Sequence, residues 1–101
     1  MDWKRKENQR LIEALLAIQN SDQAERFLRD LMTEGEIDEF AKRLKTAEML
    51  SNKISYSNIE KETGFSSTTV ARVSKWLNDG TGGYKEIIKN MHHNNPTKLR
   101  K

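Results

Sequence analysis

The feature that most constrains this fold is the near absence of residues that interrupt a helix. The single proline is Pro96, and only five glycines occur along the chain. A proline inside a helix costs about 3 kcal/mol, so a chain without one before Pro96 is free to form long helices. Apolar residues recur at intervals of three and four, and no stretch shows the alternation of β-branched residues that is typical of a strand. The sequence therefore predicts an all-α fold.

Apolar spacing and capping residues divide the chain into about six helices. The first is expected from about Trp3 to Asn20, and Asn20 or Ser21 then caps a second helix. Thr33 and Glu36 have the spacing of a capping box, which opens a long central helix that ends near residues 51–53. A last short amphipathic helix is expected around residues 84–91. We expect one helical domain over residues 1–95 and a basic, disordered tail over residues 96–101.

The segment from Tyr56 to Leu77 is typical of a helix-turn-helix, in which two short helices are joined by a tight turn. Ser57 and Glu60 fit a second capping box, and Gly64 supplies the left-handed turn residue. The second helix is expected from near Ser67 to Asn78. Apolar residues occupy the positions where the two helices pack together: Ile59, Phe65, Val70, Val73 and Leu77. The general pattern favours a small residue at position 60, so the Glu60 carboxylate must point outward or be paired.

Once the apolar residues of the second helix face inward, its hydroxyl and basic residues are left outward. Serine and threonine bond to base edges or phosphates, an arginine suits a guanine edge or a phosphate, and an alanine can touch a thymine methyl group. The candidate DNA-binding residues are Ser57, Ser66, Ser67, Thr68, Thr69, Ala71, Arg72 and Lys75. Lys75, Lys85 and Lys89 are candidates for contacts to the sugar-phosphate backbone. An ordinary helical hairpin with a polar face is the alternative.

Basic residues are concentrated in the second half of the chain. Residues 22–50 contain five basic and eight acidic residues, whereas residues 72–101 contain seven basic and two acidic residues. The overall net charge of +3 is weak evidence for nucleic-acid binding, but phosphate binding needs a one-sided positive field of this kind. A basic tail that is merely solvated is the simpler interpretation of the last residues.

Several classes of protein are disfavoured by what the sequence lacks. Without cysteine there are no disulfides or thiolate metal ligands, and the adjacent His92 and His93 point in different directions on a helix. No phosphate-binding loop, nucleophile elbow or suitably placed histidine base is present, so we expect neither an enzyme nor a cofactor. No apolar run approaches the roughly 20 residues that span a bilayer, and no signal peptide is evident. We expect a cytoplasmic protein without a membrane partner, associated with the bacterial nucleoid when bound to DNA.

The order and spacing of three pieces of sequence are fairly specific: LRDLMTEGEIDEFAKRLKTAEML, then NIEKETGFSSTTVARVSKWL, then the short helix that follows. From about Phe27 to Ile88 the chain resembles the tryptophan repressor family, and more closely its YerC/YecD-like branch. The resemblance implies an interlocked, all-helical homodimer, in which the helices before the helix-turn-helix entwine with those of the partner. A chain of this size builds one thin core, which suits such pairing. The two recognition helices would meet successive major grooves, about 34–36 Å apart, on a two-fold symmetric operator.

The better-known members of that family bind L-tryptophan between the central helix and the recognition helix. The resemblance implies that the matching pocket residues here are Thr33, Arg43, Thr69, Arg72, Val73 and Trp76. Arg43 matches the arginine that meets the ligand carboxylate, and Arg72 matches the arginine that lies against the indole. Val73 stands where the family has a glycine that makes room for the indole, so we expect its side chain to block tryptophan. Trp76 replaces a serine and is expected to cover part of the same hollow.

The sequence thus predicts a homodimeric, sequence-specific transcriptional regulator, a repressor, that binds double-stranded DNA and does not respond to tryptophan. Its recognition helices adopt the DNA-binding arrangement without ligand, or they respond to an unknown small-molecule effector. Two alternatives stay open: a protein-interaction module built on the helix-turn-helix, and a binder of single-stranded nucleic acid, which lacks an aromatic platform here. Arg43 and Arg72 also have a simpler interpretation as surface or phosphate-contacting arginines.

Overall fold

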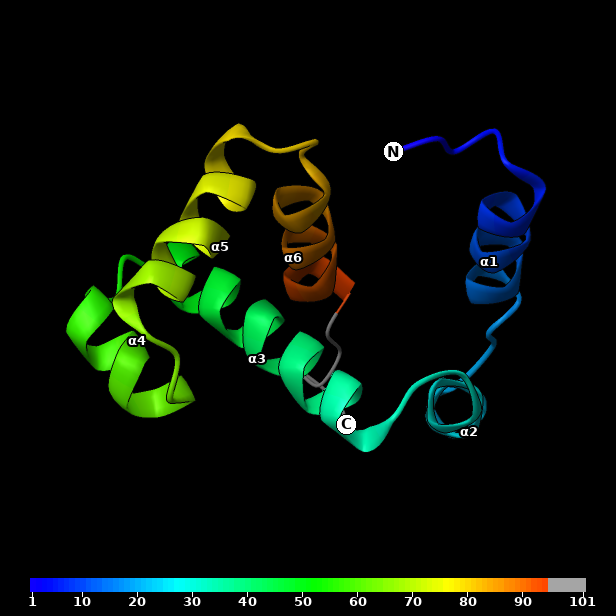
Figure 1. The fold of residues 1–101 in the computed structure, drawn as a ribbon, viewed down its shortest axis with the longest axis horizontal. Helices are drawn as coiled ribbons and strands as arrows, with labels where there is room; N and C mark the ends of the chain where they lie inside the picture. Colours follow the sequence, from blue (N-terminus) through cyan, green and yellow to red (C-terminus); the bar gives the residue numbers. More distant parts are fainter. Residues whose placement is uncertain (95–101) are drawn as a thin grey trace. The chain divides into compact units, whose positions relative to one another are not determined.

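A computed structural model describes residues 1–94 of the chain, and these residues form six α-helices and no strand (Figure 1). The predicted all-α class and the expected number of helices are therefore confirmed. The expected tail over residues 96–101 lies outside the described residues. The chain divides into two compact units, Met1–Ile37 and a second unit from Asp38 onward. The helices are α1 (Lys6–Leu16), α2 (Ser21–Leu31), α3 (Glu34–Ser51), α4 (Tyr56–Thr63), α5 (Ser67–Asp79) and α6 (Gly83–Asn94).

Side-chain caps fix where several helices begin. The Asn20 side chain accepts a hydrogen bond of 2.9 Å from the Gln23 backbone N–H at the start of α2. At the start of α3 the Glu36 N–H donates to the Thr33 hydroxyl (3.1 Å) and the Thr33 N–H donates to the Glu36 carboxylate (2.9 Å). The predicted capping box is confirmed, and it satisfies two backbone donors that a helix start would leave unpaired.

Two predicted boundaries are wrong. The first helix spans only Lys6–Leu16, because Asn20 must adopt an extended backbone to cap α2 and the chain leaves the helix before it. The predicted capping box of Ser57 and Glu60 does not form. Ser55 instead caps α4, accepting from the Asn58 N–H at 3.2 Å, so α4 begins at Tyr56. Ser55 and Ser57 are two residues apart, and Ser55 is the one that caps the helix.

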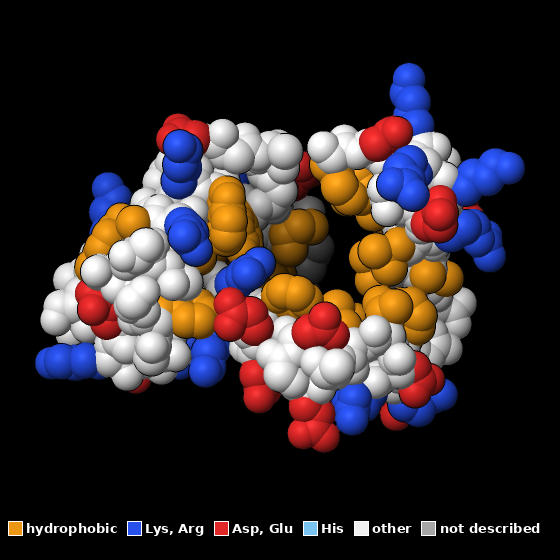
Figure 2. Space-filling view, in the orientation of Figure 1, with side chains coloured by type: hydrophobic (Ala, Val, Ile, Leu, Met, Phe, Trp, Pro, Cys, Tyr) orange, Lys and Arg blue, Asp and Glu red, His pale blue; other side chains and the backbone are white. Residues whose placement is uncertain are grey.

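The first unit has little core of its own. None of its residues is fully buried, and α1 and α2 are 11 residues each. The side chain of Leu16 is 80% exposed, and Figure 2 shows hydrophobic side chains uncovered along α1. Isolated helices of this length are marginal in water, because too few hydrogen bonds offset the cost of ordering the chain. Burial within this unit is therefore insufficient to hold it together.

The second unit contains the buried core. Ala47, Val73 and Ile88 join α3, α5 and α6, with Leu44, Leu50 and Tyr84 packed around them. The helix α4 packs against α5, where Ile59 and Val70 are fully buried. The inward positions predicted for the helix-turn-helix are confirmed, with Phe65 half-buried over the turn.

The turn between α4 and α5 depends on Gly64 and Thr63. Gly64 has a φ of 77°, in the left-handed region where a side chain is strained. The buried Thr63 hydroxyl donates to the Ile59 carbonyl at 2.8 Å and accepts from the Phe65 N–H at 3.1 Å. One hydroxyl thus ties the last turn of α4 to the first residue after the elbow, which fixes the direction in which α5 leaves.

Opposite effects are expected for the same substitution at two glycines. Gly64→Ala is expected to lower the free energy of unfolding by about 1–2 kcal/mol, because alanine is strained at this positive φ. Gly35→Ala, in the first turn of α3, is expected to raise it by about 0.5–1 kcal/mol, because alanine forms helix better than glycine. An added Cβ there meets only the Thr33 hydroxyl, at 3.9 Å.

Urea unfolding of both variants at one protein concentration provides the measurement, since any self-association makes stability depend on concentration. Equal destabilisation by the two substitutions would contradict the assigned role of Gly64 as the elbow.

Candidate nucleic-acid interface

The helix α5 has one buried side and one open side. Val70, Val73 and Leu77 are buried on the first. At 100° per residue, Thr68, Arg72 and Lys75 share the opposite side, and all three are exposed. Ser67 and Ala71 are exposed on the same helix. The structure therefore brings five of the eight predicted DNA-binding residues together on one accessible surface of α5.

The remaining hydroxyl residues have different surroundings. Ser66 caps α5, its hydroxyl accepting from the Thr69 N–H at 3.2 Å, and the Thr69 hydroxyl lies 3.2 Å from the same oxygen. Thr69 is half-buried, so these two residues shape the first turn of the helix. Ser57 is exposed in the first turn of α4, a separate element. By contrast, the hydroxyls of Ser67 and Thr68 make no hydrogen bond within residues 1–94.

The basic side chains on the open side of α5 are not neutralised by the residues that the structure describes. Within residues 1–94, neither Arg72 nor Lys75 forms an ion pair, although five arginines elsewhere do. Lys85 and Lys89 are exposed on α6. Unpaired cations on an accessible helix are suited to phosphate groups and to the acceptor edge of guanine.

Arg43 forms the centre of an aromatic cluster that links α3 to α5. Its guanidinium lies over the ring of Phe40 at 5.3 Å and over the ring of Trp76 at 5.4 Å. Its Nε is 3.4 Å from a Glu39 carboxylate oxygen. Burial raises the pKa of the Tyr84 phenol above its ordinary value of 10.0, and the positive charge of Arg43 acts on that pKa in the opposite direction. The half-exposed cation thus already has two aromatic rings and one carboxylate of this chain as neighbours.

The six residues of the expected effector pocket have different surroundings. Val73 is fully buried in the core, whereas Arg72 is exposed. Thr33 belongs to the first unit, where its hydroxyl is used in capping α3. Arg43 and Trp76 are in contact with each other. A hollow of about 360 Å³ beside Trp76 is lined also by Gly80, Thr81, Gly83 and Tyr84, but by neither arginine.

Sequence reasoning missed three members of the Arg43 cluster. Phe40 and Glu39 precede Arg43 by three and four residues in one helix, and this spacing is a signal that places side chains together. Tyr84 gave no such signal, because it is far from Arg43 in sequence and is brought near it only by the tertiary fold.

An all-α fold in which an exposed, basic helix follows a capped elbow defines a protein of the helix-turn-helix class. The chain belongs to the Trp repressor family, since the family model of the Trp repressor protein matches residues 6–92. This is a family of non-enzymatic regulators. The uncharacterised protein YerC of Bacillus subtilis (strain 168) is 39% identical over 83 residues, which are 82% of this chain and 80% of YerC.

Two solved structures share the fold. A TrpR-like protein from Eubacterium eligens ATCC 27750 superposes with a TM-score of 0.85 at 31% identity, covering 89% of this chain and 93% of that one. A candidate Trp repressor from Staphylococcus aureus superposes with a TM-score of 0.84 at 30% identity, covering 91% and 95%. The resemblance inferred from the sequence is therefore confirmed over most of the chain.

No three histidine, cysteine, aspartate or glutamate side chains within residues 1–94 are grouped so that they could hold a metal ion. Within the same residues, no helix is long and apolar enough to cross a membrane.

L-Tryptophan is expected to give no saturable binding in calorimetry at micromolar concentrations. The physical reason is steric: Val73 is packed against the core, and Trp76 already covers the Arg43 cation. Binding with a micromolar dissociation constant would contradict this expectation.

Proposed function

We propose that this chain is a sequence-specific, double-stranded DNA-binding regulator of transcription, a repressor, that reads its operator with α5. The observation that carries the proposal is the row formed by Thr68, Arg72 and Lys75, which is exposed and unpaired within residues 1–94. The left-handed turn at Gly64 also supports the proposal. It sets the direction of α5, and a helix can read a major groove only if it projects in one direction.

The roles of individual residues follow from their positions. Ser67, Thr68 and Arg72 contact base edges, and Ala71 contacts a thymine methyl group. Ser66 and Thr69 keep the first turn of α5 rigid beside the DNA, and Ser57 contacts the backbone from α4. The remaining contacts are electrostatic, from ammonium groups to phosphates: Lys75, Lys85 and Lys89.

The working form is an interlocked homodimer. The first unit has no fully buried residue, yet Leu11, Ile12 and Leu15 form an apolar stripe on α1. A second copy that packs on this stripe supplies the burial the unit lacks, and it joins residues 1–95 into one domain. Family membership favours the same arrangement. Two α5 helices related by two-fold symmetry then require a two-fold symmetric operator.

DNA binding does not depend on tryptophan. In this proposal Trp76 of the chain itself stacks on Arg43 and joins α3 to α5 in the absence of ligand. Any effector is a different small molecule. The cytoplasm is the compartment that suits such a regulator.

Replacing Arg72 and Lys75 separates base reading from phosphate binding. Arg72→Ala is expected to weaken operator binding by about 1–3 kcal/mol and to relax the base preference at one position. Lys75→Ala is expected to weaken binding to all duplexes alike and to reduce the salt dependence by about one counterion. Selection of bound duplexes from a random pool, followed by retardation assays over a range of salt concentrations, measures both effects.

The rival function, a protein-interaction module, gives a different result in the same experiment. No retardation of any duplex at low salt would favour that module. An equal loss for every sequence on changing Arg72 would assign this residue to the phosphates instead of the bases.

A pair of substitutions on α1 tests the dimer. Leu15→Gln is expected to weaken self-association at least tenfold, because burying a leucine contributes about 1.5–3 kcal/mol and each of two copies loses it. Lys6→Gln is the matched control, since nine residues at 100° place Lys6 on the opposite side of α1. Sedimentation equilibrium measures both, and a monomeric wild-type chain would refute the dimer.

A further inference from the structure

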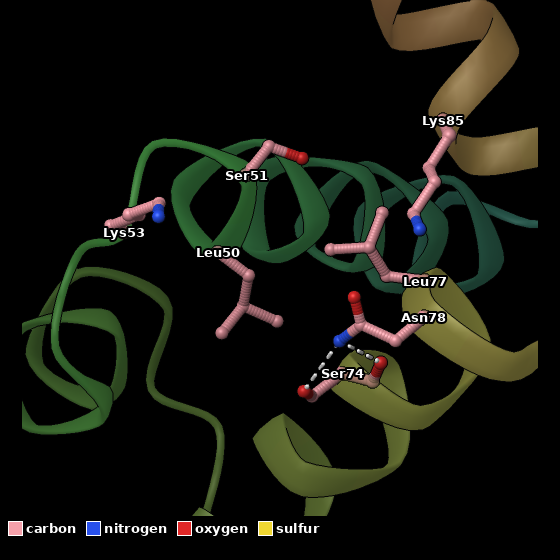
Figure 3. A pocket seen from close by; sticks show the side chains of 7 residues that line it. All are labelled: Leu50, Ser51, Lys53, Ser74, Leu77, Asn78 and Lys85. Carbon is pink, nitrogen blue, oxygen red and sulfur yellow. Dashed lines mark hydrogen bonds between the residues drawn. The ribbon is translucent and has the colours of Figure 1, made fainter.

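A hollow of about 330 Å³ lies within the second unit where α3 ends beside α5 and α6 (Figure 3). Its volume is within the range of small-molecule sites. It shares no residue with the Arg43 cluster or with the exposed row on α5. The residues that line it are Leu50, Ser51, Lys53, Ser74, Leu77, Asn78 and Lys85.

The charged groups at this hollow are all positive. Lys53 follows the end of α3 and Lys85 reaches toward the hollow from α6 (Figure 3). No acidic residue lines it, and neither ammonium group forms an ion pair within residues 1–94. Two unpaired lysines from separate elements that line one hollow favour an anion between them. Lysine acts as a point charge that suits a phosphate group, whereas planar carboxylates are matched better by arginine.

The backbone of Lys53 adds an independent observation. Its φ of 61° makes it the one residue other than glycine with a positive φ among residues 1–94. The Ile54 N–H donates to the Met49 carbonyl and the Lys53 N–H to the Leu50 carbonyl, both at 3.0 Å, which is a Schellman end of α3. Glycine or asparagine suits that position best. The backbone conformation of this residue therefore does not by itself select a lysine.

The neutral groups complete the site. The Asn78 side-chain N–H groups donate to the Ser74 carbonyl oxygen at 2.9 Å and to the Ser74 hydroxyl at 3.3 Å. This arrangement leaves the Ser74 O–H able to donate elsewhere, and the Ser51 hydroxyl lines the same hollow. Leu50 and Leu77 form the apolar part of the lining, so the site has room for an organic group attached to the anion.

We propose that this hollow binds a phosphate group. The ammonium groups of Lys53 and Lys85 neutralise its charge, and the hydroxyls of Ser51 and Ser74 donate to its oxygens. The phosphate belongs either to a free phosphorylated small molecule or to the DNA backbone. In both cases binding acts on α5, because Ser74, Leu77 and Asn78 are part of that helix.

Titration of the whole chain with inorganic phosphate, followed by amide NMR, tests the proposal without DNA. Saturable shifts are expected at the backbone amides around the hollow. Lys53→Asn keeps a residue that tolerates the left-handed backbone, so the fold is retained while the charge is lost. This variant and Lys85→Gln are each expected to weaken phosphate binding at least tenfold. Lys45→Gln, which removes an exposed lysine of α3 outside the hollow, is the control and is expected to change nothing.

Duplex binding without free phosphate identifies the source of the phosphate. Because Lys85 is already assigned a contact to the DNA backbone, Lys53→Asn is the variant that decides: unchanged duplex affinity in Lys53→Asn, together with lost phosphate binding, assigns the site to a free phosphorylated molecule. An equal loss of affinity for all duplexes, with a weaker salt dependence, assigns it to the DNA backbone, and this arm alone rests on the proposed function. If a double variant, Lys53→Asn with Lys85→Gln, matches Lys45→Gln in the phosphate titration, the hollow is not a phosphate site.

Discussion

The burial of one side of α5 is the constraint on which the rest of this structure depends. Val70, Val73 and Leu77 bind this helix to α4 on one flank and to α3 and α6 through the core. Because three buried positions fix the rotation of the helix, the opposite residues have to face solvent. The exposed row of Thr68, Arg72 and Lys75 is thus a consequence of core packing, and no local preference of those residues is needed to explain it.

The Arg43 cluster has a second, electrostatic consequence. A half-buried guanidinium needs compensation, and here two aromatic rings and Glu39 provide it from the same chain. An arginine that is already paired has less to gain from an added carboxylate ligand. The same contacts connect α3 to α5, the helix proposed to read DNA. Side chains of the protein thus support the orientation of α5 relative to α3 without a ligand.

The two units differ in how far their own burial supports them. The second unit has a core and a capped elbow, whereas α1 and α2 have neither a fully buried residue nor the length to be stable alone. The apolar stripe on α1, formed by Leu11, Ile12 and Leu15, has the spacing of a helix that packs against another surface. The proposed homodimer would account for that stripe, because two packed copies would bury what each chain exposes.

The sequence by itself determined the helical class, the elbow at Gly64 and the inward face of α5, because helix periodicity and a left-handed turn are properties of neighbouring residues. It did not determine which of Ser55 and Ser57 caps α4, since both residue types suit a cap, and the structure shows Ser55 in that position. Tertiary structure alone decided that Trp76 and Tyr84 lie near Arg43, and that Lys53 and Lys85 line one hollow. Contacts between residues far apart in sequence depend on how the helices pack, and the sequence alone does not give the spatial distances between those residues.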